Sequence, residues 1–235
     1  MRNIMNQRTP KCSCVNCQLK TLFFSHVSSE ELFDICDIKE ERTYTKGDLI
    51  IKEGEPITEF LYMKEGLVKL SRSSGEGKDQ IISFSKPFDF VSLLSVFSSE
   101  TYMYSVSAVE DSVVCILDLN VVKNKAQQNA MFTMDLMTRI SSATDKIIIQ
   151  NLDIRKKQLR GRVAHVLLYF SDQIYESDEF ELPVSRREIA EFIGMTTENV
   201  IRTLSEFRKD KIIKIFGKDI LIADKKRLSG IADFG

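Results

Sequence analysis

One segment, SRREIAEFIGMTTENVIRTLSEFRK from Ser185 to Lys209, restricts the possible folds of this chain most strongly. Ser185 and Glu188 have the spacing of a capping box, which predicts that a first helix begins there. Gly194 suits the left-handed turn that ends such a helix, and Thr196 can cap a second helix. The second helix then has apolar residues at the spacing of a buried face, namely Val200, Leu204 and Phe207. These features predict two short helices joined by a tight turn.

The opposite face of the second helix has the side-chain types that read bases in the major groove of DNA. Arginine pairs with guanine, glutamate accepts from cytosine, and an apolar side chain contacts the methyl group of thymine. The candidate base-contacting residues are Thr196, Thr197, Glu198, Asn199, Ile201 and Arg202. Glu198 and Arg202 taken alone would favour an ordinary surface ion pair four residues apart.

Nearby cations and a predicted hairpin favour DNA binding over a simple surface ion pair. Arg186 and Arg187 stand at the start of the first helix, where they can contact phosphates. Residues 212–222, IIKIFGKDILI, predict two strands around a glycine turn, with Lys214 and Lys218 available for phosphate contacts. A helix, a turn, a second helix and a hairpin in this order predict a winged helix-turn-helix.

The stretch VSRREIAEFIGMTTENVIRTLSEFRKDKIIKIFGKDI resembles the DNA-binding region of the catabolite-activator/FNR (CRP/FNR) family of bacterial transcription regulators. The resemblance implies an α+β chain with an N-terminal jelly roll of the cyclic-nucleotide-binding type, a long dimerisation helix and a C-terminal winged helix-turn-helix. It also implies a homodimer on an inverted-repeat operator in double-stranded DNA. Glu198 and Arg202 would read a TGA-like half-site core, and RNA polymerase would be a further partner.

The expected domain boundaries follow from this organisation. We expect a cysteine-containing tail over residues 1–22, a jelly-roll sensing domain over 23–125, a dimerisation helix over 126–156 and the DNA-binding domain over 157–235. Within the second of these, short apolar runs alternate with glycine turns, which predicts a sandwich or small barrel. The candidate strands are Leu49–Ile51, Phe60–Met63, Leu67–Leu70, Ile81–Phe84 and Tyr104–Leu117.

The segment Pro87–Val122 corresponds to the region that holds the cyclic phosphate in nucleotide-binding relatives. A buried phosphate must meet a cation or a cluster of N–H donors, yet this segment contains neither Lys nor Arg. We therefore expect an unknown small effector rather than cyclic AMP. An apolar effector pocket and plain core packing are the alternative roles for Phe88, Phe90, Ser92, Leu93, Tyr102, Met103 and Tyr104.

Cysteines cluster in the N-terminal tail, where Cys12, Cys14 and Cys17 form C-x-C-x-x-C. Without an export signal, this clustering argues against disulfides and leaves metal or redox chemistry. In the FNR branch, cysteines of the tail and one cysteine of the effector domain hold an iron–sulfur cluster. The segment around Cys115 resembles the segment that carries this effector-domain cysteine. The match breaks at Phe23, where the next tail cysteine would stand. An iron–sulfur cluster, zinc, thiol redox sensing and unligated thiols with Cys115 as a small core residue all stay open.

A helical pattern from Ala126 to Lys156 has no interior glycine or proline. Its apolar stripe recurs at three- and four-residue spacing, as in a coiled-coil seam. In the position of the family's dimerisation helix, this stripe predicts a two-helix homodimer, although a helix of an intramolecular core would show the same pattern. The predicted interface residues are Leu136, Ile140, Ala143, Ile147 and Ile154.

The overall composition excludes several classes of protein. No apolar stretch is long enough to span a membrane and no signal peptide is visible, so we expect a cytoplasmic protein. The only histidines are His26 and His165, and no catalytic constellation appears, so we do not expect an enzyme. The net charge is −1, but Lys and Arg outnumber Asp and Glu from Arg155 onward. The alternative function is a sensor or adaptor whose winged helix binds protein instead of DNA.

Overall fold

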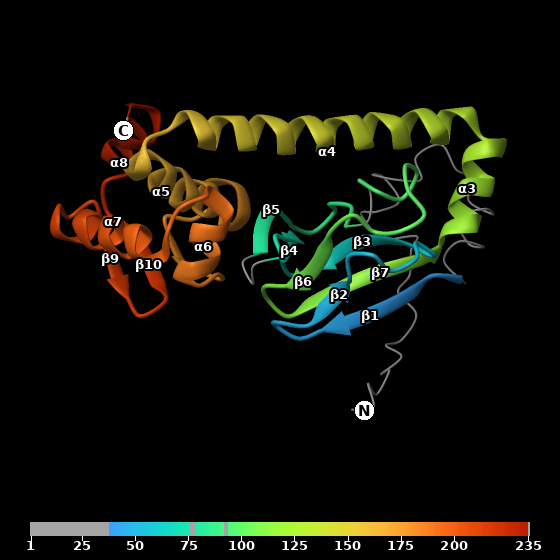
Figure 1. The fold of residues 1–235 in the computed structure, drawn as a ribbon, viewed down its shortest axis with the longest axis horizontal. Helices are drawn as coiled ribbons and strands as arrows, with labels where there is room; N and C mark the ends of the chain where they lie inside the picture. The colour runs from blue at the N-terminus through green and yellow to red at the C-terminus, as the bar shows by residue number, and fades with distance from the viewer. Residues whose placement is uncertain (1–37, 76–78, 92–93, 235) are drawn as a thin grey trace. The chain divides into compact units, whose positions relative to one another are not determined.

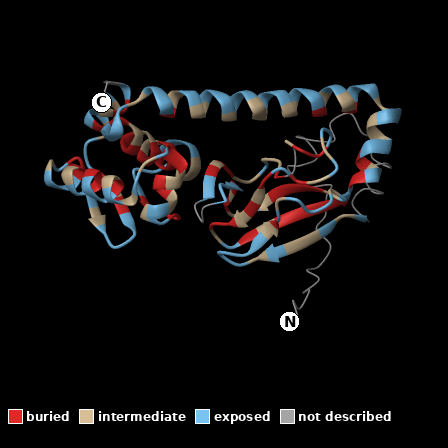
Figure 2. Cartoon of the chain, in the orientation of Figure 1, coloured by how far each residue is buried: buried red, intermediate tan, exposed pale blue. Residues whose placement is uncertain are grey.

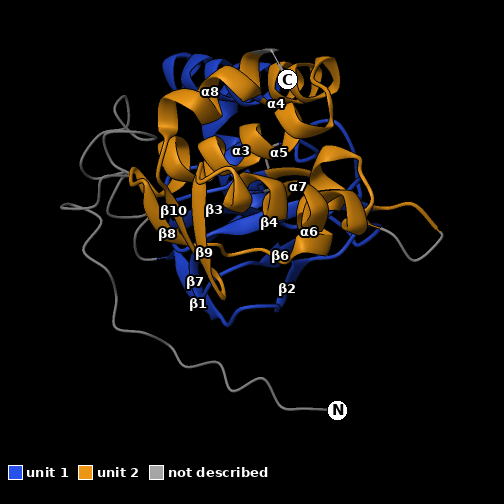
Figure 3. Cartoon of the chain, turned by 90° about the vertical axis from the view of Figure 1, so that its left-hand side faces the viewer, with its two compact units in different colours: residues 1–72, 84–146 blue, residues 73–83, 147–235 orange. Residues whose placement is uncertain are grey.

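The computed structural model describes residues 38–75, 79–91 and 94–234 (Figure 1). The chain divides into two compact units, residues 1–72 with 84–146 and residues 73–83 with 147–235 (Figure 3). Among the described residues, no helix combines the length and apolar character needed to cross a bilayer. The domain boundaries expected from the sequence stay predictions.

Short strands in the first half of the chain form two sheets, as the sequence predicts. One sheet has the order β1-β7-β3, all antiparallel, from Glu40–Tyr44, Ser112–Asp118 and Glu59–Glu65. The other has the order β2-β6-β4-β5, from Leu49–Ile51, Ser105–Ala108, Val68–Ser73 and Asp79–Ser85. Each candidate strand region contains an observed strand, and the run Tyr104–Leu117 splits into β6 and β7.

Strand β1, Glu40–Tyr44, is not anticipated by the apolar pattern because three of its five residues are charged. It pairs along its whole length with β7. Arg42 donates to Glu59 on β3 at 2.7 Å and to Glu40 at 3.0 Å, so the charged side chains pair with one another. One face of an antiparallel sheet can lie in water, so an edge strand can carry several charged side chains.

The single helix predicted from residue 126 is in fact two helices. Helix α3, Leu119–Gln128, ends at Asn129, and α4, Ala130–Lys156, follows. Asn129 is extended, with φ −129° and ψ 102°, and its side-chain oxygen accepts from the backbone N–H of Phe132 at 3.0 Å. The asparagine thus caps α4 and interrupts the helical pattern, because Asn is favoured at helix N-caps.

The core of the first unit lies between the β1-β7-β3 sheet and the helices α3 and α4. It consists of Phe60, Tyr62, Val96, Cys115, Leu117, Leu119, Val122, Phe132 and Leu136. Ile140 and Ala143 pack against this cluster and are partly buried. Three of the predicted dimer residues, Leu136, Ile140 and Ala143, therefore face the chain's own core.

The second unit contains the predicted helix-turn-helix and hairpin. Its elements are α5 (Leu159–Leu168), a π-helix η2 (Tyr169–Tyr175), β8 (Glu179–Glu181), α6 (Arg186–Ile193), α7 (Thr197–Lys209), β9 (Ile213–Phe216), β10 (Asp219–Ile222) and α8 (Lys225–Phe234). The sheet order is β8-β10-β9, so β8 adds a third strand to the predicted hairpin.

Among the described glycines of the jelly roll, Gly66 tolerates a side chain least. Its φ is +86°, and a Cβ there would overlap Asp111 O and Ser112 Oγ. We expect Gly66→Ala to lower the free energy of unfolding by about 2–4 kcal/mol through overlap and backbone strain. Gly47→Ala is the matched control, because Gly47 has φ +94° but open space around it. It should cost only about 1 kcal/mol. Urea denaturation measures both, and equal losses would contradict the overlap argument.

Candidate nucleic-acid interface

The first helix of the helix-turn-helix, α6, begins with the predicted capping box. Ser185 Oγ accepts from the N–H of Glu188 at 3.2 Å, and a Glu188 carboxylate oxygen accepts from the N–H of Ser185 at 2.8 Å. Gly194 ends the helix in the left-handed conformation with φ 64°, as the sequence predicts. The apolar side of α6 is buried, through Ile189, Ala190, Phe192 and Ile193.

The second helix, α7, is held by its apolar face. Thr196 caps it by accepting from the N–H of Asn199 at 3.3 Å. The buried residues are Val200, Leu204 and Phe207, as predicted, together with Thr203. Because this face is occupied by the core, the other face is turned outward. It exposes Glu198, Ile201, Arg202, Ser205 and Arg208, while Thr197 and Asn199 are half-buried.

Arg202 is in contact with neighbours on its own helix. Its guanidinium donates to Asn199 Oδ1 at 3.0 Å and lies 4.0 Å from the Glu206 carboxylate. Both contacts are exposed, so solvent screens them and they add little to stability. Arg202 can therefore exchange them for an acceptor on a base at small cost.

The four predicted phosphate contacts differ in exposure. Lys214 and Lys218 are exposed on the hairpin, and Lys218 Nζ lies 3.8 Å from a Glu181 carboxylate. Arg187 is exposed and pairs with Glu191 at 2.8 Å. Arg186 is half-buried, and this burial lowers the pKa of its guanidinium, which nevertheless stays charged. Lys214, Lys218 and Arg187 are thus exposed, and Arg186 is the least accessible of these cations.

Two arginines on α5, which sequence reasoning missed, anchor the helix-turn-helix. Arg160 lies 3.4 Å from the Glu206 carboxylate and 3.1 Å from that of Asp210, and its guanidinium is 5.3 Å from the centre of the Phe207 ring. These contacts hold the C-terminal half of α7. No short motif marks Arg160, because its partner Asp210 lies 50 positions away in the sequence.

Arg162 connects the C-terminal ends of two helices. It donates to the carbonyls of Arg155 at 3.3 Å and Lys157 at 3.0 Å, at the end of α4. It also donates to the carbonyl of Ile193 at 3.1 Å, at the end of α6. The last carbonyls of a helix lack partners within the helix and carry partial negative charge, so a guanidinium is well suited to them. The direction of α6 is thereby linked to the end of α4.

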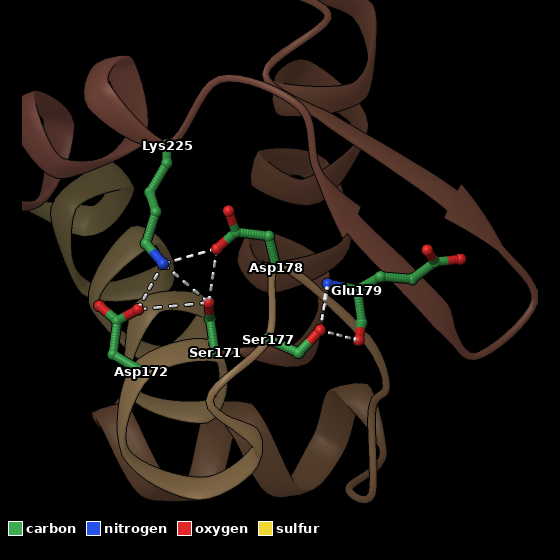
Figure 4. Close-up of polar contacts among 6 residues, drawn as sticks. All are labelled: Ser171, Asp172, Ser177, Asp178, Glu179 and Lys225. Atoms are coloured by element: carbon green, nitrogen blue, oxygen red, sulfur yellow. Dashed lines mark hydrogen bonds and ion pairs between the residues drawn. The ribbon is translucent and has the colours of Figure 1, made fainter.

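A polar cluster, shown in Figure 4, fixes the start of β8 and the end of β10 beside η2. Lys225 Nζ lies 2.6 Å from an Asp172 carboxylate oxygen and 2.5 Å from one of Asp178. Ser171, which is fully buried, donates to Asp178 at 3.1 Å. The backbone adds a bond from Ile222 N–H to Asp178 O at 2.8 Å. These contacts position the sheet that carries Lys214 and Lys218.

The candidate effector residues do not line one common surface in the described part of the chain. Tyr102 and Tyr104 are buried, and their hydroxyls donate to the carbonyls of Glu59 and Val91, both at 3.3 Å. Phe90 packs against Phe60 with ring centres 5.4 Å apart, whereas Phe88 and Met103 are exposed. Ser92 and Leu93 lie outside the described residues. The apolar effector pocket stays a prediction.

Cys115 is a fully buried core residue beside a cluster of three charged side chains. Its thiol lies 3.9 Å from the Glu41 carboxylate, and burial raises its pKa to about 11. Burial also raises the pKa of Glu41, but hydrogen bonds from Lys39 and Lys64 outweigh this and hold it below its usual value. No group of three metal-binding side chains occurs in the described part of the chain. Cys12, Cys14 and Cys17 lie outside it.

Comparison with known proteins identifies both halves of the chain. The cyclic nucleotide-binding domain family matches residues 41–129, and the Crp-like helix-turn-helix domain family matches residues 161–231. Transcriptional activator protein anr of Pseudomonas aeruginosa is 27% identical over 229 residues, which cover 95% of this chain and 93% of that protein. The chain belongs to the CRP/FNR family of transcription regulators.

Other CRP/FNR relatives are similar over most of their length. Electron transport regulator A of Shewanella oneidensis is 25% identical over 93% of this chain and 90% of its own. The solved structure of FixK2 from Bradyrhizobium japonicum has the same fold, with a TM-score of 0.73 and 23% identity over 83% of this chain and 97% of FixK2. CRP/FNR proteins are DNA-binding transcription regulators and are not enzymes. The predicted family, fold class and role in DNA-binding transcription regulation are confirmed.

The polar cluster around Lys225 predicts a pH-dependent stability. Hydrogen bonding to Lys225 holds the pKa of Asp178 below its usual value, so this contribution is present at neutral pH and is lost as the pH falls through the lowered pKa. Lys225→Met should lower the free energy of unfolding by no more than about 1 kcal/mol at pH 7, because solvent screens these half-exposed charges. The deficit should shrink as the pH falls below about 4 and through the lowered pKa of Asp178.

The neighbouring exposed Lys226 provides the control for this prediction. Lys226→Met removes the same charge without touching Asp172 or Asp178, so it should leave stability almost unchanged at both pH values. Chemical denaturation of both variants at pH 7 and pH 3.5 is the measurement. A deficit for Lys225→Met that does not depend on pH would contradict an electrostatic role.

Proposed function

We propose that the chain acts as a homodimer on an inverted-repeat operator, with α7 of each protomer in the major groove. The observation that carries this proposal is the division of α7 into a buried apolar face and an outward face with Glu198, Ile201 and Arg202. A buried face fixes the helix, and the outward face has a donor, an acceptor and an apolar group for base edges. Glu198 and Arg202 would read a TGA-like core, and Ile201 would contact a flanking base.

The surrounding cations would position the helix without reading sequence. Lys214, Lys218 and Arg187 are exposed, and each can meet a phosphate. A regulator that acts on bacterial promoters works in the cytoplasm, with RNA polymerase as its partner. The alternative, an adaptor whose winged helix binds protein, would not select a sequence from a random pool of duplexes and would show no steep salt dependence.

Arg202→Ala tests base readout. Removing the guanidinium should cost about 1–3 kcal/mol of operator affinity and relax the preference at one base pair, because an Arg–base pair is specific. Lys214→Ala, the phosphate control, should weaken all sequences alike and flatten the salt slope by about one. Duplex selection followed by titration at several salt concentrations measures both effects. If Arg202→Ala lowered affinity without changing base preference, the proposed readout would be wrong.

For the dimer we propose a different face of α4 from the one predicted by the apolar stripe. Leu136 and Ile154 are buried within the chain, and Ile140, Ala143 and Ile147 are partly covered. The outward apolar residues, each about half exposed, are Met131, Met134, Met137, Ile148, Ile149 and Leu152. Met134, Ser141 and Ile148 recur every seven residues at the centre of this face, which fits a coiled-coil seam. Figure 2 shows how much of α4 is exposed.

This dimer would set the geometry of the operator. Two recognition helices related by a twofold axis meet successive major grooves about 34 Å apart, so half-sites should lie about one helical turn apart. A signal in the jelly roll need only change the packing of the two α4 helices to misplace both recognition helices. A 100-fold change in affinity requires only about 2.7 kcal/mol of differential stabilisation.

Ile148→Asp tests the proposed dimer face. A charge at the centre of an apolar seam should shift the protein to monomers and abolish binding to the inverted repeat at nanomolar concentrations, because each half-site alone binds weakly. Lys146→Asp is the control, since two residues turn the helix by about 200° and place this exposed side chain away from the seam. Sedimentation analysis measures the mass. If the Ile148→Asp variant stayed dimeric, the dimer interface would have to lie on another surface.

The signal that controls this dimer is a redox change or a small effector other than cyclic AMP. The described residues contribute one thiol, Cys115, which is protonated and fully buried, so they do not by themselves form a site for iron–sulfur or zinc. Analysis of the anaerobically purified protein for iron, acid-labile sulfide and zinc distinguishes a metal-based sensor from a metal-free one.

A further inference from the structure

Phe216, at the tip of the β9–β10 hairpin, is a large apolar side chain without a place in the core. The residue is 68% exposed, more than any other large hydrophobic residue in the described part of the chain. The inward positions of the hairpin are filled by Ile213, Ile220 and Ile222, all buried. No ring or cation contact involves Phe216 within the described residues. The fold therefore does not require an aromatic side chain there.

The hairpin presents Phe216 next to two exposed lysines, Lys214 and Lys218. Successive strand residues point to opposite faces, so Phe216 shares the outer face of β9 with Lys214. Gly217, with φ 65°, forms the turn, and Lys218 follows it. The hairpin starts close to the recognition helix, because the N–H of Ile212 donates to the carbonyl of Phe207 in α7 at 2.9 Å.

The charges around Phe216 cancel. Lys214 and Lys218 supply two positive charges, while Asp219 is directly opposite Phe216 in the β-ladder and Glu181 lies 3.8 Å from Lys218. A tip with no net charge gains little from long-range attraction to DNA beyond the direct phosphate contacts of its two lysines. Phe216 itself can add an apolar contact, and the apolar edges of deoxyribose in the minor groove are exposed on every duplex.

We propose that Phe216 makes an apolar contact with deoxyribose and the minor-groove edge of duplex DNA, beside the major groove entered by α7. Proteins that bind the minor groove also place apolar side chains there, where they can insert between base steps. The inference rests on the proposed function, because it requires that α7 bind DNA. Phe216 contributes affinity that does not depend on salt, in contrast to the lysines on either side.

The test uses full-length protein and a fluorescent duplex that the wild type selects from a random pool. Phe216→Ser should weaken binding about tenfold, which corresponds to about 1.4 kcal/mol. The slope of log affinity against log salt should stay unchanged. Phe216→Leu, which keeps an apolar side chain, should restore most of the affinity. Lys218→Ala should flatten the slope by about one. Because Phe216 is exposed, thermal unfolding of all three variants should match the wild type.

The outcomes separate this inference from the proposed function. If the wild type selects a duplex and Phe216→Ser binds it within twofold of the wild type, the inference fails and the proposed function stands. Normal DNA binding with lost transcription activation would assign Phe216 to a protein partner and would also overturn the inference. If the wild type selects no duplex, the proposed function itself fails.

Discussion

Burial of one face of α7 is the constraint on which the candidate interface depends. Val200, Leu204 and Phe207 must leave water, and only one orientation of the helix places all three in the core. The polar face is consequently turned outward, with no separate interaction needed to expose it. Arg160 then fixes the C-terminal half of the helix through two carboxylates and the Phe207 ring. Packing thus determines which side chains can reach DNA.

The long helix α4 has apolar residues on two faces, one buried and one exposed. Its inner face, from Phe132 to Ala143, completes the core of the jelly-roll unit. Its outer face leaves methionines and isoleucines about half exposed. At its end, Arg162 donates to carbonyls of both α4 and α6. A movement of the C-terminal end of α4 would therefore displace Arg162 and, through it, the end of α6.

The β9–β10 hairpin exposes both charged and apolar side chains. Its two lysines, Lys214 and Lys218, are balanced by the carboxylates of Asp219 and Glu181, in keeping with a nearly neutral chain. The polar cluster of Lys225, Asp172, Asp178 and Ser171 holds the same sheet from its other end. Each of these ion pairs is weak in water, and together they determine position more than stability.

Local signals in the sequence were sufficient for the helix-turn-helix and the hairpin. Ser185, Gly194 and Thr196 act on their own immediate neighbours, and the stripe on α7 records its buried face. The sequence did not reveal β1, whose charged residues find partners on other strands, or the break at Asn129. Tertiary structure alone decided which face of α4 is covered. An apolar stripe shows that a face is buried, but the same pattern arises whether a sheet of the same chain or a second protomer covers it.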